Sequence, residues 1–582
     1  MPLRTLRMPL TVFLLLIIAA GCGPAPLPSA PSAGTTEPDD AAVDTPSPTV
    51  SYVIEQPTPL PEYDAAPLPD DIGRLFSASG ACADCHTGMK DRAGSDVSMG
   101  VDWPGAIMAN ASRDPYWQAS VRSEVLDHPG LTAVIEDKCA TCHTPMARFT
   151  AASAGNDSPL LDGGFLSDDH PDHGLAIDGV SCAVCHQIEQ QGFGEPDSFS
   201  GGYVIDLELP TGQRLAYGPF RPARIPASVM QDVSGFRPVR GPHAGEAELC
   251  ATCHTLYTPY VDENGEVAGT FPEQVPYLEW QHSDHAETES CQDCHMPPTD
   301  GPVRLASMGG GPPRSPFAQH RFIGGNTYIL KMLWALGEDL NVTASSHHFA
   351  RKVAQTLEQL QERTATLSVG QADVRESRLS FDVVVRSLAG HKVPTGFPSR
   401  RAWLHVIVED EVGNVVFESG AFGPDGAIAG NDNDADAAAY EPHYEMITDP
   451  SQVQIYEPIL EDVSGGVTTA LLEAKGYRKD NRLLPQGFDK ASAGADFAVY
   501  GAAVDDTDFA APGDTVRYAV ELPEAPGSLS VRVELLYQSI GYRWTENLRG
   551  QNAPEIAQFV NAYDDLPNLP VIVAEASLTV EP

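Results

Sequence analysis

Apolar and polar side chains alternate along several short stretches in the last third of the chain, which is the pattern of strands with one buried face. These stretches cover residues 379–385, 401–408, 415–417, 516–522 and 529–535. The second and third of them flank Gly413-Asn414, a pair that favours a hairpin turn. We therefore predict a β-sandwich-like domain over residues 366–582, with a long insertion at 421–512.

A helical period marks the segment just before this domain. Phe349, Val353, Leu357 and Leu360 recur every three or four residues, so they share one face of a helix. All eleven cysteines lie earlier in the chain than this helix, and none lies in the strand-rich part. The sequence therefore predicts an α+β multidomain protein, in which a cysteine-bearing domain over 71–365 precedes the β-sandwich-like domain.

The N-terminus has the features of an export signal. Arg4 and Arg7 precede an apolar stretch at 10–20 that is too short for a comfortable membrane span. The stretch ends at Ala19-Ala20-Gly21-Cys22, and small residues directly before a cysteine resemble a bacterial lipobox. We predict a lipoprotein signal peptide over 1–21 and lipidation of Cys22; the alternative is an ordinary signal peptide with an incidental cysteine. On either interpretation the chain is exported.

Residues 22–70 are rich in Pro, Ala, Ser and Thr and carry acidic residues. Such a composition cannot build a packed core, so we predict an extended, disordered tether. A tether behind a lipid anchor would hold the folded part away from a membrane, on the periplasmic side or at the cell surface. No later stretch is long and apolar enough to span a bilayer.

The 582 residues are 42% hydrophobic and carry a formal net charge of −44. A sizeable core can therefore be buried. The charge argues against nucleic acid as a partner, because few cations are present to neutralise phosphate. It also argues against docking on anionic lipid through a basic patch. An acidic surface favours solubility and cationic partners, so charge alone names no partner.

Ten of the eleven cysteines form five pairs of one spacing, each followed by histidine. The motifs are Cys82-Ala-Asp-Cys85-His86, Cys139-Ala-Thr-Cys142-His143, Cys182-Ala-Val-Cys185-His186, Cys250-Ala-Thr-Cys253-His254 and Cys291-Gln-Asp-Cys294-His295. Two thiols at this spacing reach the two vinyl groups of one haem and form thioethers, and the adjacent histidine binds the iron from the proximal side. We predict five covalently attached c-type haems.

Two other interpretations explain the motifs less well. Zinc ribbons use CxxC pairs two at a time, so five pairs leave one over, and they do not need a histidine after each pair. Local disulfides would suit an oxidising compartment, but the five histidines would then be coincidental.

Twelve of the 17 histidines remain as distal iron ligands. Five are favoured by their positions: His173, His243 and His285 each precede a haem motif, His320 precedes a pair of glycines, and His391 lies between Gly390 and a Pro-Thr-Gly turn. Met108 is a weaker candidate, because we favour its interpretation as a core methionine. His347 and His348 stand at the entrance of the predicted helix, so we do not expect them on iron.

Two longer motifs resemble known cytochromes. Glu279-Trp280-Gln281-His282-Ser283-Asp284-His285-Ala286 followed by Cys291 to Pro297 is similar to multihaem cytochromes grouped with the tetrahaem cytochrome of nitrifiers and hydroxylamine oxidoreductase. Residues 390–403 (GHKVPTGFPSRRAW) resemble a segment of bacterial multihaem cytochromes with a C-terminal β-domain. The resemblance covers roughly residues 75–410. It implies an α-helical, loop-rich haem core with stacked haem pairs, and distal ligation by His285 and His391.

An acidic run in the insertion is a candidate calcium site. Residues 431–436 (NDNDAD) place carboxylates at alternate positions, and Ca²⁺ takes oxygen ligands from such a run. The run lacks the glycine and terminal glutamate of an EF-hand, and acidic loops are common in this chain.

Two functions remain open. The first is a membrane-anchored electron-transfer protein, whose five six-coordinate haems connect a membrane-side donor with an external or periplasmic acceptor. The second is an oxidoreductase that acts on a small nitrogen or sulfur compound at one five-coordinate haem. The chain lacks the CxxCK motif that is typical of pentahaem nitrite reductases, which favours the first function. The partners expected are redox proteins or an extracellular electron acceptor.

Overall fold

The computed structural model describes residues 59–308, 311–522 and 527–581. The predicted signal peptide, Cys22 and most of the predicted tether lie outside these residues. None of the helices in the described ranges is long and apolar enough to cross a membrane. The described residues belong to one compact unit.

The strand-rich part contains two five-stranded sheets. One has the order β10-β15-β7-β5, with β6 paired to β7; the other has the order β11-β8-β16-β17, with β9 paired to β8. Their bounds are β5 Ala365–Val369, β6 Asp373–Arg375, β7 Arg378–Ser387, β8 Arg401–Glu409, β9 Val415–Ser419, β10 Met446–Ile447, β11 Ile455–Tyr456, β15 Gly513–Glu521, β16 Leu529–Gln538 and β17 Val571–Val580. The predicted strands and the hairpin at Gly413, whose φ is +86°, are confirmed.

One core joins the two sheets. Alternate side chains of β7, such as Phe381 and Val383, are buried against Val406 of β8 and Val533 of β16. The predicted insertion is part of this domain, because its short strands β10 and β11 extend the two sheets. It also holds α14 (Asp432–Ala435) and a three-stranded sheet of β12 (Pro458–Asp462), β13 (Val467–Thr468) and β14 (Ala474–Asp480). The α+β fold class is confirmed.

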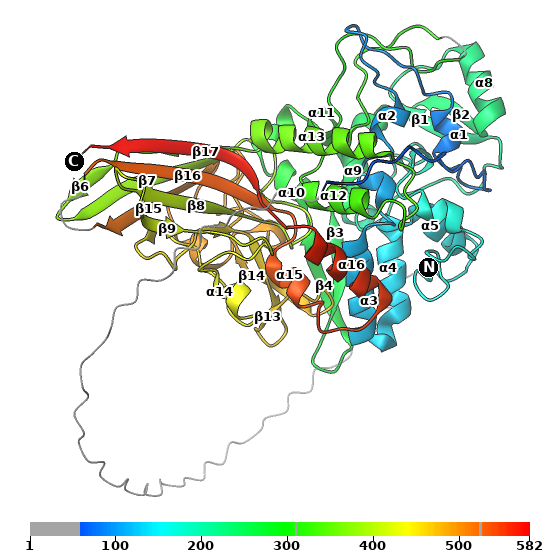
Figure 1. The fold of residues 1–582 in the computed structure, drawn as a ribbon. Helices are drawn as coiled ribbons and strands as arrows, with labels where there is room; N and C mark the ends of the chain where they lie inside the picture. The colour runs from blue at the N-terminus through cyan, green and yellow to red at the C-terminus, as the bar shows by residue number, and fades with distance from the viewer. Residues whose placement is uncertain (1–58, 309–310, 523–526, 582) are drawn as a thin grey trace, which may run out of the picture. The chain divides into compact units, whose positions relative to one another are not determined.

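The cysteine-bearing part consists of short helices and loops (Figure 1). The helices are α1 Gly80–Ala83, α2 Met99–Asp102, α3 Pro115–Asp127, α4 Thr132–His143, α5 Pro145–Ser153, α6 His173–Ile177, α7 Cys182–Cys185, α8 Arg224–Ser234, α9 Ala247–His254, α10 Pro276–Gln281, α11 Cys291–His295, α12 Thr327–Ala335 and α13 Ser346–Arg363. Two small sheets interrupt them: parallel β1 (Arg214–Gly218) with β2 (Phe236–Arg240), and antiparallel β3 (Leu256–Val261) with β4 (Val267–Gln274).

The C-terminal segment returns to the cysteine-bearing part. After β16 come α15 (Tyr542–Glu546) and α16 (Pro554–Asp565), and α16 packs against α3 (Figure 1). Phe559 of α16 shares a hydrophobic cluster with Tyr116 of α3 and Leu333 of α12. Arg122 of α3 pairs with Glu555 of α16 at 2.9 Å. The two predicted domains are therefore packed into one unit.

The described end of the predicted tether is docked on this unit. The Tyr63 hydroxyl donates to the carbonyl of Trp334, and the Trp334 indole donates to the carbonyl of Pro61. Ser346, at the start of α13, donates to the Glu62 carboxylate. The boundary predicted at residue 70 is therefore too late, because an aromatic residue within a proline-rich segment finds a partner surface on α12 and α13.

Candidate functional site

All fifteen cysteines and histidines of the five CxxCH motifs line one continuous cavity. Its volume of about 1580 Å³ exceeds the roughly 300–1,000 Å³ of a site for one small ligand. Each motif lies on or at the end of a short helix: α1, α4, α7, α9 and α11 carry them in chain order. The fold therefore gathers five equivalent sets of two thiols and one imidazole around a common space.

The motifs are also close to one another. Cysteine thiols from different motifs lie close enough to shift each other's pKa in three pairs. The pairs are Cys82 with Cys182, Cys142 with Cys253, and Cys250 with Cys291. The first motif is thus beside the third, and the fourth is beside both the second and the fifth.

Backbone carbonyl groups orient the motif histidines. In four of the five, Nδ1 lies at hydrogen-bonding distance from a carbonyl oxygen, between 2.5 and 2.8 Å. These pairs are His86 with Leu305, His143 with Ala111, His186 with Tyr217, and His295 with Ile323. A proton on Nδ1 leaves Nε2 as the metal-binding nitrogen. Burial lowers the pKa of His143 and of His254 to about 4, so both imidazoles are neutral at pH 7 and can bind a metal ion.

Two predicted distal ligands lie opposite motif histidines. The ring centroids of His186 and His320 are 6.3 Å apart, and those of His295 and His391 are 6.2 Å apart. Two nitrogen–metal bonds of about 2.0 Å and two ring radii give roughly 6.3 Å for imidazoles on opposite sides of one ion. The Nδ1 atoms of His320 and His391 also lie 3.1 and 2.9 Å from carbonyl oxygens, which leaves Nε2 available on each.

The other candidate ligands are placed differently. His285 and Met108 line the cavity, whereas His173 and His243 are not among its lining residues. Nε2 of His243 lies 3.0 Å from the carbonyl oxygen of Ile188, so this nitrogen already has a partner. His173 has one ring nitrogen by the Phe165 carbonyl and the other by Asp168. Position ahead of a haem motif therefore does not distinguish the histidines that reach the cavity from those that do not.

His348 stands at the start of α13, as expected, where it completes a capping box with Ser345. The Ser345 side chain accepts from the backbone N–H of His348, while the His348 ring accepts from the backbone N–H of Ser345. Nδ1 of His348 therefore already accepts a hydrogen bond at the start of α13.

The two motifs that resemble known cytochromes meet beside His391. The Ser283 hydroxyl donates to the carbonyl of Gly390 at 3.0 Å, and a Cβ at Gly390 would lie 3.1 Å from Cβ of His285. The hydroxyl of Thr395 donates to the Glu279 carboxylate at 2.6 Å. Close approach of the two backbones thus requires the absence of a side chain at residue 390.

Buried ion pairs reinforce this junction. Lys392 and Arg482 both contact Asp480 at 2.7 Å, and Arg482 also lies 2.9 Å from Glu279. All four side chains are buried. Despite burial, the two cations lower the pKa of Asp480 to about 2, so the carboxylate stays ionised. The network joins α10 of the cysteine-bearing part to β14 and the loop after β7.

Buried or partly buried carboxyl groups line the cavity, and two of them, Glu124 and Glu273, lie near Cys139 of the second motif, a feature that the sequence analysis missed. Asp114, Glu124 and Glu273 all line the cavity. Burial raises the pKa of Asp114 to about 6, that of Glu124 to about 7 and that of Glu273 to about 8. Asp114 caps α3, and Glu124 accepts from the backbone N–H groups of Leu471 and Leu472. Nothing in the local sequence distinguishes these residues from the many exposed acids.

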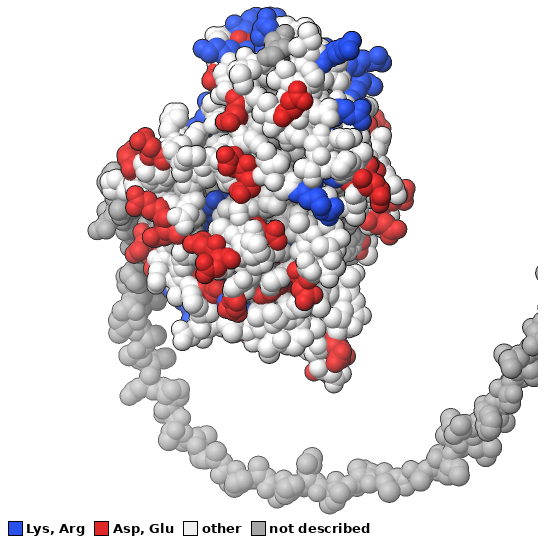
Figure 2. Space-filling view, turned by 90° about the vertical axis from the view of Figure 1, so that its right-hand side faces the viewer, with Lys and Arg blue, Asp and Glu red and all other residues white. Residues whose placement is uncertain are grey.

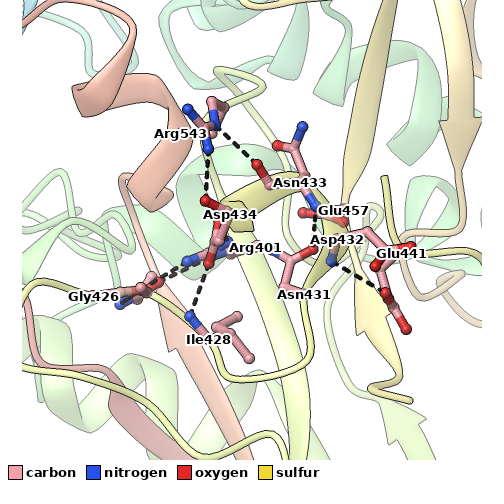
Figure 3. A network of polar contacts seen from close by, with 12 residues as sticks. Arg401, Gly426, Ile428, Asn431, Asp432, Asn433, Asp434, Glu441, Glu457 and Arg543 are labelled. Atoms are coloured by element: carbon pink, nitrogen blue, oxygen red, sulfur yellow. Dashed lines mark hydrogen bonds and ion pairs between the residues drawn. The ribbon is translucent and has the colours of Figure 1, made fainter. Parts of the chain in front are cut away.

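The acidic run at 431–436 has other partners in the structure (Figure 3). Asp434 forms a buried ion pair with Arg401 at 2.8 Å and accepts from the backbone N–H of Ile428. Asn431 caps α14, and Arg543 donates to the carbonyl of Asn433 (Figure 3). Within the described residues, the run does not bring three carboxylate or imidazole ligand atoms together. Its most buried carboxylate is paired with Arg401, and calcium binding by this run stays a prediction.

The donor sets in the cavity fit covalently attached haem. Each motif supplies two thiols and a neutral imidazole, and the cavity provides space beyond that of a single ligand. Two further imidazoles stand where a second axial ligand of the third and fifth sets would be. The same residues do not fit zinc ribbons, because contacts between different motifs involve single thiols and not two whole CxxC pairs.

The sequence matches no protein-family model and no curated protein. Among solved structures, a penta-heme cytochrome c552 from Thermochromatium tepidum aligns with 86% of this chain and 98% of its own, at 16% sequence identity and a TM-score of 0.46.

Proposed function

We propose that this chain is an exported pentahaem c-type cytochrome that transfers electrons. The observation that carries the proposal is that five CxxCH motifs open into one cavity, with His320 and His391 facing two of the motif histidines. Bound haem supplies a one-electron Fe³⁺/Fe²⁺ couple at each position. The role of the chain is to hold five such groups in fixed, neighbouring positions and to keep bulk water away from them.

The proximity of thiols from different motifs supports an order for the sites. The first site neighbours the third, and the fifth neighbours the fourth; Cys185 of the third motif also lies near Cys253 of the fourth. The second site branches from the fourth through Cys142. The sites thus form a path in the order first, third, fourth and fifth, with the second as a side branch. A path with two far ends suits a carrier that exchanges electrons with two partners.

The proposal includes location and partners. A lipid on Cys22, followed by a proline-rich segment, would tether the protein to a membrane on its periplasmic or outer side. The partners would then be a membrane-side donor and a periplasmic or extracellular acceptor. The short apolar segment ahead of Ala19-Ala20-Gly21-Cys22 supports this location.

Mass spectrometry and spectroscopy test the proposal. Protein produced with its export signal in a host that attaches haem c should carry five haems per chain, measured by intact mass and by haem absorbance after denaturation. Dithionite should reduce all five, and electron paramagnetic resonance of the oxidised protein should show low-spin iron. Fewer than five haems, or haems that dithionite does not reduce, would contradict the proposal.

The carboxyl groups around the second motif favour a second candidate function. Glu273 is buried and lines the cavity, and its raised pKa of about 8 keeps it protonated at pH 7. A protonated acid beside an iron with an open position could supply a proton to a small nitrogen or sulfur compound. A high-spin signal that nitrite or hydroxylamine shifts, and that His143→Ala but not His295→Ala removes, would support this oxidoreductase.

A further inference from the structure

Basic residues are concentrated in two segments of this acidic chain. The chain has 80 acidic and 36 basic residues, yet residues 209–245 contain five arginines and one acid, and residues 301–326 contain three arginines and no acid. The mean composition therefore conceals a local excess of positive charge. Seven of these eight arginines are exposed or partly exposed. The Arg321 guanidinium donates to the Gln319 side chain, and we call the other six the arginine surface: Arg221, Arg224, Arg237, Arg240, Arg304 and Arg314.

The two segments are joined in the structure. Arg314 donates to the carbonyl of Arg221 at 2.8 Å, and Arg304 donates to the carbonyl of Gly311 at 3.3 Å. A Cβ at Gly311 would lie 3.6 Å from the side chain of Pro226, so this part of the second segment lies against α8. Figure 2 shows Lys and Arg gathered at the upper end of the molecule, where α8, β1 and β2 lie in Figure 1, and acidic side chains over the rest of that face.

The arginine surface lacks internal charge compensation. Across the described residues, none of its six guanidinium groups lies within 4.0 Å of a carboxylate, whereas Arg92 nearby pairs with Asp300. Asp232 of α8 is the one acid of the first segment. Exposed apolar side chains lie among the arginines: Ile225 is 72% exposed, Met308 58% and Val233 52%. Unpaired arginine around exposed aliphatic groups is the composition of a protein–protein interface, in which Arg is enriched and Lys is depleted.

This surface covers the first haem site. The carbonyl of Leu305, next to Arg304, lies 2.5 Å from Nδ1 of His86. The backbone N–H of Ser307 donates to the carbonyl of Cys85 at 2.8 Å. Arg221 and Arg314 themselves line the cavity that holds the five motifs. A protein seated here would lie against the loop that hydrogen-bonds to the first site.

We propose that the arginine surface docks an acidic redox protein, which exchanges electrons with the first haem site. This inference rests on the proposed function. Its physical basis is a charge contrast: the acidic surface around it repels an acidic partner and the arginine surface attracts it, so diffusional encounters are steered to the site at one end of the haem path. The exchange moves one electron and no atoms, from a ferrous iron to the oxidised centre of the partner or in the reverse direction.

An acidic blue-copper protein in its Cu(II) form is a suitable probe. Mixed with the dithionite-reduced cytochrome after removal of excess reductant, it accepts one electron, so that Fe²⁺ becomes Fe³⁺ and Cu²⁺ becomes Cu⁺. Stopped-flow absorbance gives the second-order rate constant. We expect the constant to fall as ionic strength rises, and to fall at least about tenfold in the double variant R224E/R237E.

Matched variants separate docking from other effects. Neither Arg224 nor Arg237 makes a side-chain hydrogen bond or ion pair with another described residue, so the double variant should keep its haem content and melting temperature. R386E/R532E makes the same charge change on exposed arginines of β7 and β16, and should leave the constant within about twofold of wild type. Equal losses in both double variants would overturn the proposal, because only net charge would then matter.

Two further results would overturn it. The first is a salt-independent constant that R224E/R237E does not change. The second is binding to vesicles of phosphatidylcholine and phosphatidylglycerol (3:1) that R224E/R237E abolishes without changing the copper-protein rate, since an anionic membrane would then be the partner. Reduction of five haems by dithionite in the same samples would show that the haems are present and redox-active. A failure of docking can then be distinguished from a failure of the proposed function.

Discussion

The carboxylate of Glu279 accepts a hydrogen bond from the backbone N–H of Lys392 at 3.1 Å. Glu279 lies in α10, between the fourth and fifth haem motifs, and Lys392 directly follows His391. The contact therefore links the backbone beside a candidate axial ligand to the part of the chain that carries the motifs. Its partners are all buried, so it is shielded from solvent.

Replacement of Glu279 by glutamine should destabilise this junction. The change removes a buried negative charge that faces Arg482 and Lys392, and breaking a buried pair costs about 3–5 kcal/mol. We expect the free energy of unfolding in guanidinium chloride to fall by about 2–4 kcal/mol, because Asp480 still accompanies both cations. The exposed Glu287→Gln should change it by less than about 0.5 kcal/mol. Similar values for both variants would show that Glu279 does not hold the junction.

His320 and His391 should each be needed for one low-spin iron. His320→Ala and His391→Ala remove one imidazole from a facing pair, so one haem in each variant should become high-spin in electron paramagnetic resonance. His282→Ala is the control, since the His282 ring is hydrogen-bonded to the Asp489 carbonyl and does not line the cavity. Unchanged low-spin spectra in the first two variants would show that these histidines are not iron ligands.

Stability should depend on the protonation of Asp514. Burial raises its pKa to about 7 in the folded protein, against 3.8 when exposed. The folded state therefore binds this proton more tightly than the unfolded state. The contribution of Asp514 to the free energy of unfolding is largest below about pH 4, falls as the pH rises to about 7, and no longer changes above that pH. Asp514→Asn should remove that decline.

Relative to wild type, the unfolding free energy of Asp514→Asn should rise by a few kcal/mol between pH 4 and pH 8, at about 1.4 kcal/mol per pKa unit. Denaturant titrations at four pH values would measure this change. Asp505→Asn, an exposed neighbour, should keep the wild-type slope. A parallel pH dependence in Asp514→Asn and wild type would show that another carboxyl group with a raised pKa, such as Glu124 or Glu273, is responsible.

Asp434 should act as the partner of Arg401. Asp434→Asn leaves a buried guanidinium without its carboxylate, which should lower the free energy of unfolding by about 3–5 kcal/mol. Asp436→Asn, which alters an exposed residue of the same run, should be close to neutral. Addition of CaCl₂ or EDTA should leave the melting temperature of wild type unchanged. A rise in melting temperature with CaCl₂ that Asp434→Asn abolishes would instead show that the run binds calcium.

Local patterns in the sequence predicted elements well where one face is buried. The alternation at 379–385 and the aligned apolar residues of 349–360 became β7 and α13, because each pattern needs only a neighbouring core. The CxxCH motifs were equally easy to recognise, since each contains both thiols and the histidine within five residues. No local pattern predicts the parallel pairing of β1 with β2 or the packing of α16 against α3, because both depend on segments that are distant in the sequence.

The candidate site was less predictable for the same reason. Which histidine faces which motif is decided by packing, so His320 and His243 looked alike in sequence although only His320 reaches the cavity. Net charge was also misleading. A value of −44 predicted no basic patch, whereas the arginines of two segments far apart in the chain are brought together by the fold.

The junction at Glu279 bears on how such a chain can evolve. A boundary drawn at residue 365, where the sequence character changes, would separate Glu279 from Lys392 and His295 from His391. Exchange of the strand-rich half with that of a distant relative would break a buried ion-pair network and remove the imidazole that faces His295 in a single event. The two halves should therefore be inherited together, and substitutions at either side of the junction should accumulate in pairs.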